Sequence, residues 1–344
     1  MKAYKEAQNN RAIANLNAVL EQLPQWVRYF FTGKENSTSA RTRLSYAYDI
    51  RIFLEYLSEK IFHIPIKEIK LEHLNQVTTQ DVEIYASQLA YYTRNEKIYT
   101  NDKCGKFRKL ASLRSFYNYF YKREMIQKNP TLVLEMPEIE DKAITQLDQN
   151  EIVKLLNGVD KGNNLNAREQ KFHRLTRKRD IALLSLLLGT GMRVSECAGI
   201  DMDDLDLNER GVRVLRKGGK EHILYFNNEV AKALESYILE KEEKGIQSVD
   251  NALFVSLKGK RMAVRTIQAM VKKYSERNIT LKTITAHKLR STYGTQLYRK
   301  TGDIYLVADA LGHRDVNTTK KHYAKMDDNR RKQAADIIQL REME

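Results

Sequence analysis

The sequence predicts a mainly α-helical protein of two domains with one small β-sheet. Its 344 residues are enough for about two domains, and a hydrophobic content of 42% is enough to build their cores. The chain has four prolines and none follows Pro137, so the second part is free of the residue that breaks helices. The alternating segments VRVLR and HILYF flank Lys217-Gly218-Gly219-Lys220, which predicts a β-hairpin with a two-residue Gly-Gly turn.

Three amphipathic helices predict the first domain. Apolar residues recur every three or four positions in residues 37–57, in VTTQDVEIYASQL and in residues 106–124. Thr78 followed three residues later by Asp81 gives the second of these helices a capping box. Residues 1–23 have a similar pattern, which we interpret as an N-terminal helical extension ahead of this domain.

The boundary between the domains is predicted where helical periodicity stops. Asn129-Pro130 ends the third helix, and residues 135–148 are acidic with little periodicity before NEIVKLL begins a new helix. We therefore expect a first domain at 24–137, a linker at 138–148 and a second domain from residue 149 onward.

The charge balance indicates a polyanionic partner. The chain has 59 Lys and Arg against 44 Asp and Glu, a formal net charge of +15. A general basic surface would explain this excess, but phosphate binding explains it better, so we expect a nucleic acid as partner.

Cysteine usage and hydropathy restrict the location of the protein. Cys104 and Cys197 lie far apart, which argues against a disulfide scaffold and against a CxxC zinc site. The start of the chain lacks a continuous apolar region, and no apolar run approaches the roughly 18 residues of a membrane span. We expect a soluble protein of the reducing cytosol.

Two segments of the second domain place a cationic side chain beside a loop. In GTGMRVSE, Arg193 lies three residues before Glu196, a spacing that also fits a purely structural ion pair. Lys217 lies at the tip of the hairpin, where most lysines are only exposed to solvent.

Two further segments carry histidines. In TAHKLRSTYG, His287 and Arg290 lie on one helix face behind a Thr285 cap, near the positive helix end that attracts phosphate. In LGHRDVNTTKKHY, His313 follows a glycine, and Tyr323 comes ten residues later. Read alone, His287 could equally be structural, and Tyr323 is one of 19 tyrosines.

In this order, the four segments resemble the tyrosine recombinase (phage integrase) family, and they are most similar to the single-recombinase Xer proteins of Firmicutes. KFRKLASLRSFYNYF with the following NP resembles the end of the family's helical core-binding domain, so the likeness covers most of the chain. It implies a core-binding domain at 24–137 and a catalytic domain at 149–329 that form a clamp on DNA. The catalytic residues it implies are Arg193, Lys217, His287, Arg290, His313 and Tyr323.

Phosphodiester transfer gives these residue types their roles. Without a metal, arginine forks such as those of Arg193 and Arg290 must neutralise the charge on the pentavalent phosphate. Tyr323 would attack phosphorus and store the bond energy in a 3′-phosphotyrosyl link, so neither ATP nor any other cofactor is expected. The resemblance assigns protonation of the 5′-oxygen to Lys217, proton transfer at the tyrosine to His287 and a phosphate hydrogen bond to His313.

One spacing departs from the family pattern. Tyr323 follows His313 by ten residues, whereas most members have nine, so the intervening loop must absorb one residue. Tyr305 and Tyr298 are the fallback candidates for the nucleophile.

The resemblance also implies partners. These are double-stranded DNA with paired inverted half-sites, a homo-tetramer on two synapsed sites in the bacterial cytoplasm, and a DNA translocase if the protein is Xer-like. Residues 330–344 would dock on a neighbouring protomer through Ala334, Ile337 and Ile338. The basic residues expected to contact DNA from the first domain are Arg41, Arg43, Lys106, Arg108, Lys109 and Arg114.

Several functions are weighed against one another. The biological role is either chromosome dimer resolution or the integration and excision of a mobile element. A catalytically silent DNA-binding protein should lack one or more of the six chemical residues, and all six are present. A metal-dependent nuclease would need clustered carboxylates, for which Asp201, Asp203 and Asp204 are the weak candidates.

Overall fold

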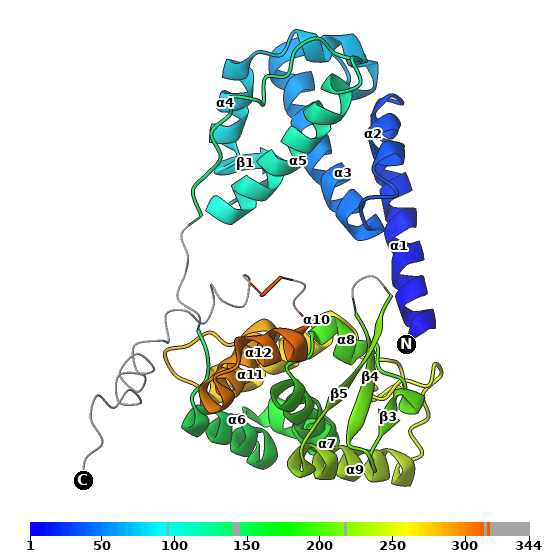
Figure 1. Cartoon of the computed structure of the whole chain (residues 1–344), viewed down its shortest axis with the longest axis vertical. Helices are drawn as coiled ribbons and strands as arrows, with labels where there is room; N and C mark the ends of the chain where they lie inside the picture. The colour runs from blue at the N-terminus through cyan, green and yellow to red at the C-terminus, as the bar shows by residue number, and fades with distance from the viewer. Residues whose placement is uncertain (95, 140–144, 217–218, 313–314, 317–344) are drawn as a thin grey trace, which may run out of the picture. The chain divides into compact units, whose positions relative to one another are not determined.

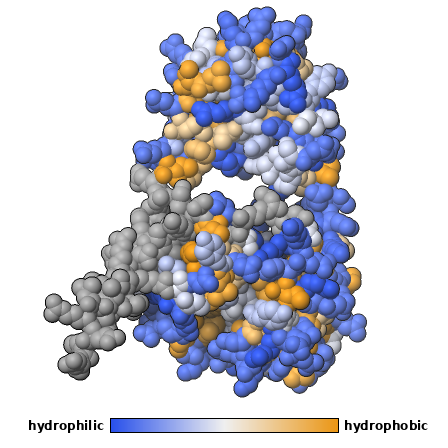
Figure 2. Space-filling view, in the orientation of Figure 1, coloured by the Kyte–Doolittle hydropathy of each residue, from blue (hydrophilic) through white to orange (hydrophobic). Residues whose placement is uncertain are grey.

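The computed structural model divides the chain into two compact units, Ala3–Lys142 and Met1–Lys2 with Ala143–Glu344. It describes residues 1–94, 96–139, 145–216, 219–312 and 315–316 (Figure 1). The division between the units falls inside the linker expected at 138–148. Hydrophilic side chains cover most of the visible face of each unit in Figure 2, and smaller hydrophobic areas lie among them.

The first unit is built from helices around one aromatic core. Phe30, Phe53, Phe116 and Tyr117 are fully buried there. The unit contains α1 (Lys2–Leu20), α2 (Val27–Gly33), α3 (Ala40–Tyr56), α4 (Thr79–Gln88) and α5 (Lys103–Tyr121), with short helical turns at Leu57–Phe62, Ile66–Glu68 and Leu71–Asn75.

Local sequence explains how two of these helices begin. Ser39 caps α3 by accepting a hydrogen bond from the Thr42 amide. The capping box expected ahead of α4 is confirmed, because the Thr78 hydroxyl accepts from the Asp81 amide and the Asp81 carboxylate accepts from the Thr78 amide.

Two features of the first unit differ from the expectation. Leu16, Val19 and Leu20 of α1 are buried in the same core, so this helix is part of the first domain and not a separate extension. A hairpin of β1 (Tyr91–Arg94) and β2 (Lys97–Thr100) lies between α4 and α5. Every residue of β2 is exposed, so the hairpin has no buried alternate positions for a sequence pattern to reveal.

The second unit surrounds the long helix α7 (Ala167–Thr190). Leu183, Leu184 and Leu187 of this helix are buried, which places the apolar run Ile181–Leu188 in the core of the unit. The other helices are α6 (Gln149–Lys161), α8 (Val194–Ala198), α9 (Asn228–Glu243), α10 (Val264–Asn278), α11 (Ala286–Thr301) and α12 (Ile304–Leu311), with a short turn at Met202–Asp204. Among the helices that the structure describes, none is both long enough and apolar enough to cross a membrane.

A three-stranded antiparallel sheet completes this unit in the order β3 (Leu205–Asp206), β4 (Gly211–Leu215) and β5 (Glu221–Tyr225). The β4–β5 pairing continues to Arg216, whose amide donates to the Lys220 carbonyl at 2.9 Å. Gly219 has a φ of +80° and its amide donates to the Arg216 carbonyl. The connection is therefore a three-residue loop with glycine in the left-handed position, and the two-residue turn expected from Gly218-Gly219 is wrong.

Candidate active site

Arg193 occupies the start of α8 and is held there by Glu196. Its amide donates to Glu196 Oε2 at 2.8 Å and its Nη1 donates to Oε1 at 2.9 Å. Glu196 is buried, whereas the Arg193 side chain is 40% exposed. The carboxylate thus orients a guanidinium that solvent, and hence a ligand, can still reach.

Arg290 joins the ends of two helices. It lies on α11, which begins at the Thr285 cap expected from the sequence. Its guanidinium is buried and donates to the Gly191 carbonyl at 2.7 Å and to the Leu311 carbonyl. Gly191 and Gly312 end α7 and α12 with φ values of +62° and +64°, so both helices stop at a glycine beside an arginine.

His287 precedes Arg290 by one helical turn and is exposed. Residues at i and i+3 lie on one helix face, so the two positions are neighbours on α11, His287 exposed and Arg290 buried. This placement leaves His287 accessible to a bound phosphate or hydroxyl.

Consecutive carbonyls at the end of α12 accept hydrogen bonds from three arginines. Arg216 donates to Asp309 and Ala310 at 3.0 and 2.8 Å, Arg290 donates to Leu311, and Arg193 approaches the Gly312 carbonyl at 3.5 Å. Carbonyls in the last turn lack partners within their own helix, and the helix dipole makes this end negative. The end of α12 therefore gathers three guanidinium groups directly before residue 313.

Arg216 is the member of this cluster that sequence reasoning missed. Burial lowers the pKa of its guanidinium, with Glu196 opposing the shift and Arg193 adding to it. An arginine remains charged in such surroundings, so Arg216 contributes a third positive charge to the site. Arg216 is the last residue of VRVLR and directly precedes Lys217, but the sequence assigned it no role of its own.

The remaining expected residues divide into two groups. Lys217, His313 and Tyr323 lie outside the residues that the structure describes, so their roles stay predictions. The fallback tyrosines are placed differently from each other: Tyr305 is 72% exposed on α12, whereas Tyr298 is 8% exposed and packs with Val307 and Leu311. Burial makes Tyr298 a poor nucleophile for a duplex.

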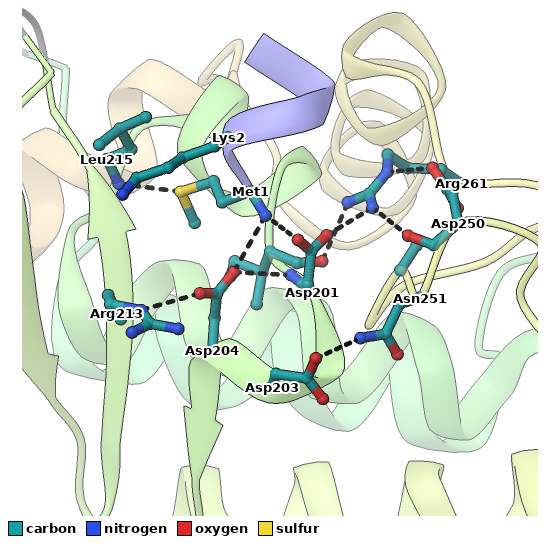
Figure 3. Close-up of polar contacts among 12 residues, drawn as sticks. Met1, Lys2, Asp201, Asp203, Asp204, Arg213, Leu215, Asp250, Asn251 and Arg261 are labelled. Carbon is teal, nitrogen blue, oxygen red and sulfur yellow. Dashed lines mark hydrogen bonds and ion pairs between the residues drawn. The ribbon is translucent and has the colours of Figure 1, made fainter. Parts of the chain in front are cut away.

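The carboxylates considered for a metal-dependent nuclease have structural partners (Figure 3). Asp201 accepts from Arg261 at 2.6 Å, and Arg261 also binds Asp250. Asp204 pairs with Arg213 at 3.0 Å, and Asp203 accepts from the Asn251 amide at 2.8 Å. Within the described ranges, no three His, Cys, Asp or Glu residues are arranged to hold a metal ion.

The basic residues of the first unit do not form one exposed face, contrary to expectation. The Arg43 side chain is 10% exposed and pairs with Glu35, and Lys109 is buried with its Nζ 3.0 Å from Asn101 Oδ1. Burial lowers the pKa of Lys109, against the attraction of Asp49. The expectation that Arg43 and Lys109 contact DNA therefore conflicts with their burial.

The other four candidates are more accessible. Arg41 and Arg108 are exposed, and Lys106 and Arg114 are partly buried. Arg108 forms an ion pair with the buried Asp49, and Arg114 donates to the Leu134 carbonyl at 2.6 Å. Arg41 and Lys106 have the fewest structural contacts of the six and are the strongest remaining candidates for phosphate contacts.

Comparison with known proteins identifies the family. The model of the phage integrase family matches residues 145–330. The chain is 33% identical to the tyrosine recombinase XerC of Caldanaerobacter subterraneus subsp. tengcongensis over 91% of this chain and 85% of that protein. It is 29% identical to the tyrosine recombinase XerD of Staphylococcus haemolyticus over 83% and 88% of the two chains.

Solved structures show the same fold. The XerH site-specific recombinase bound to palindromic difH substrate matches with a TM-score of 0.62 and 23% identity over 89% of this chain and 82% of that one. The Tn1549 transposon integrase in complex with circular intermediate DNA matches with a TM-score of 0.61 and 20% identity over 86% and 94%. The chain therefore belongs to the phage integrase family and is a tyrosine recombinase of the Xer type.

Proposed function

We propose that this recombinase cuts and rejoins duplex DNA through a 3′-phosphotyrosyl intermediate formed by Tyr323. The observation that carries the proposal is the convergence of Arg193 and Arg290 on the end of α12, directly before His313. Two guanidinium groups from different helices meet there, as a phosphodiester in transfer would require.

The residues then perform one balanced exchange. The Tyr323 oxygen attacks phosphorus, its proton passes toward His287, and the bond from phosphorus to the 5′-oxygen breaks. Lys217 donates a proton to the departing 5′-oxygen, while Arg193 and Arg290 stabilise the charge on the non-bridging oxygens. Attack by the 5′-hydroxyl of a partner strand reverses these steps, so the chemistry needs neither metal nor ATP.

The biological role we propose is chromosome dimer resolution in the bacterial cytoplasm. Support comes from XerC and XerD relatives that this chain matches over most of their length. In this role the protein would act on paired inverted half-sites as a homo-tetramer on two synapsed sites, in concert with a DNA translocase. Integration and excision of a mobile element is the second candidate, favoured by the likeness to a transposon integrase.

A nicked suicide substrate tests the chemistry. The nick lets a short oligonucleotide diffuse away after cleavage, so the covalent complex accumulates and is seen as a band resistant to denaturant. We expect this adduct to form in EDTA, and Tyr323→Phe to abolish it while retaining DNA binding. Tyr305→Phe is the matched control and should form the adduct normally. Adduct formation by Tyr323→Phe, with the link mapped to another tyrosine, would refute the assignment.

A further inference from the structure

Arg216 connects two parts of the catalytic unit that are distant in sequence. Its backbone belongs to the β4–β5 hairpin, where its amide donates to Lys220 and its carbonyl accepts from Gly219 at 3.1 Å. Its side chain reaches α12, where Nη1 and Nη2 donate to the carbonyls of Asp309 and Ala310. Both the backbone and the guanidinium of Arg216 are thus held by hydrogen bonds.

The side chain is closely packed against the glycine that ends α12. A Cβ built on Gly312 would lie 2.2 Å from Arg216 Nη1 and 2.4 Å from its Cζ. The guanidinium therefore occupies the space that a side chain at position 312 would need, and a substitution there would force the arginine to shift.

The charge of Arg216 is balanced within the same site. Glu196 and Asp309 favour its charged form, while burial and Arg193 oppose it. Its Nη1 and Nη2 donate to successive carbonyls of one helix end, so the side chain holds the hairpin and α12 together.

We propose that Arg216 is a positioning residue that fixes the loop of Lys217 to the end of α12, and so aims the lysine at the 5′-leaving oxygen. The inference rests on the proposed function, in which Lys217 is the general acid. Consecutive Cα atoms lie about 3.8 Å apart, so an anchored Arg216 restricts where its neighbour can lie.

Arginine suits this task better than lysine. Its planar fork spans two successive carbonyls, whereas an ammonium on a flexible stem behaves as a single point charge. Arg216→Lys should therefore restore only part of the function lost in Arg216→Ala.

The experiment compares two suicide substrates that differ in one leaving atom. With the natural 5′-oxygen, Arg216→Ala should form the covalent adduct about 10²-fold more slowly, the size of effect expected for a small displacement of a reacting group. With a bridging 5′-phosphorothiolate, the leaving thiolate needs little protonation, so the variant should react within a few fold of the wild type. DNA affinity should change little.

A double-mutant cycle tests whether Arg216 acts on cleavage through Lys217. If Arg216 acts through Lys217, adding Arg216→Ala to Lys217→Ala should slow cleavage no further. Arg213→Ala is the matched control, because Arg213 lies on the same strand but pairs with Asp204, and it should leave both rates unchanged. If Arg216→Ala fails to fold, Arg216→Gln and Arg216→Lys test the same comparison.

The outcomes distinguish this inference from the proposed function. Equal slowing of Arg216→Ala on both substrates, or additive slowing in the double variant, overturns the positioning role while the proposed function stands. If Lys217→Ala cleaves the oxygen substrate as fast as wild type, Lys217 is not the general acid, and the inference about Arg216 is refuted as well.

Discussion

Gly312 shows how a single residue can control this active site. Its φ of +64° is one that side-chain-bearing residues adopt at a cost of roughly 1–2 kcal/mol, and its missing Cβ leaves room for Arg216. We expect Gly312→Ala to lower both stability and the rate of adduct formation. Urea unfolding of Gly312→Ala in the wild-type and Arg216→Ala backgrounds tests this. The substitution should cost less without Arg216, since the clash is removed, and an equal cost in both backgrounds would show that only the backbone conformation matters.

Arg193 and Arg290 should contribute more to catalysis than to DNA binding. Their forks meet charge that grows in the transition state, and lysine supplies the charge without the fork. Arg193→Lys and Arg290→Lys should therefore lower the single-turnover cleavage rate far more than the affinity for an intact half-site. A fall in rate that only matched the fall in affinity would make these arginines ordinary phosphate anchors.

The sequence predicted some of these residues but not their contacts. Arg193, His287 and Arg290 were proposed because they occur in the order and spacing that resemble the family's pattern. The partners of Arg216 are backbone carbonyls more than 90 residues away, and every residue type has a carbonyl. A contact of that kind leaves no signature in residue identity, so it required the structure.

Helices α7 and α10 are joined by a buried polar network. His173 Nδ1 lies 3.1 Å from the Tyr274 hydroxyl, which donates to Asp180, and Asp180 also accepts from Thr176 and Arg179. Burial lowers the pKa of His173, with Asp180 opposing this shift. Burial therefore favours the neutral form of His173.

This lowered pKa predicts a pH dependence of stability. The unfolded chain binds a proton at His173 near pH 6.5 and the folded chain binds it only at lower pH. The contribution of buried, neutral His173 to the free energy of unfolding is thus complete above pH 6.5. It declines as the pH falls toward the pKa of His173 in the folded protein. Urea unfolding at pH 5 to 8 should show a smaller loss of stability on acidification in His173→Gln than in wild type. Parallel pH curves for the two proteins would contradict this.

Periodicity predicted elements that bury one face. The capped helix α4 and the β4–β5 hairpin have such a face, and periodicity revealed both. In the β1–β2 hairpin, β2 is exposed throughout and β1 alternates only between exposed and partly buried residues, so no buried apolar face marks it. Periodicity could not show that Lys109 lies on the buried side of α5. A lysine whose ammonium pairs with the side-chain amide of Asn101 looks, in the sequence, like its basic neighbours.

The basic residues of α3 and α5 can be separated by the salt dependence of DNA binding. Replacing Arg41 and Lys106 by Ala should flatten the plot of log affinity against log salt by about 0.9 for each phosphate that these side chains neutralise. Lys109→Ala is the control: it removes one positive charge from a buried site, so it should lower the melting temperature and leave the slope unchanged. A flattened slope in Lys109→Ala, with none in the double variant, would reverse this assignment.

At the scale of the whole molecule, charge and chemistry indicate a protein that works on DNA in several copies. The net charge of +15 favours phosphate binding, and strand exchange between two duplexes needs four cleavages at paired sites. One active site of the kind described here makes one cleavage. The family resemblance therefore predicts an assembly, and the C-terminal segment that we expect to form it lies outside the described residues.

Residues 330–344 should be needed for that assembly more than for folding. Ala334, Ile337 and Ile338 form a short apolar stripe, and one or two helical turns seldom stabilise a domain that already has its own core. A segment exchanged around a ring would instead couple neighbouring active sites. Deleting residues 330–344 should leave the melting temperature nearly unchanged and half-site binding measurable, while cooperative binding to paired half-sites and strand exchange are lost. Ala334→Glu with Ile338→Glu in the full-length chain should reproduce the loss without shortening the protein. A truncated monomer that melts many degrees earlier would place the segment in the core of its own domain.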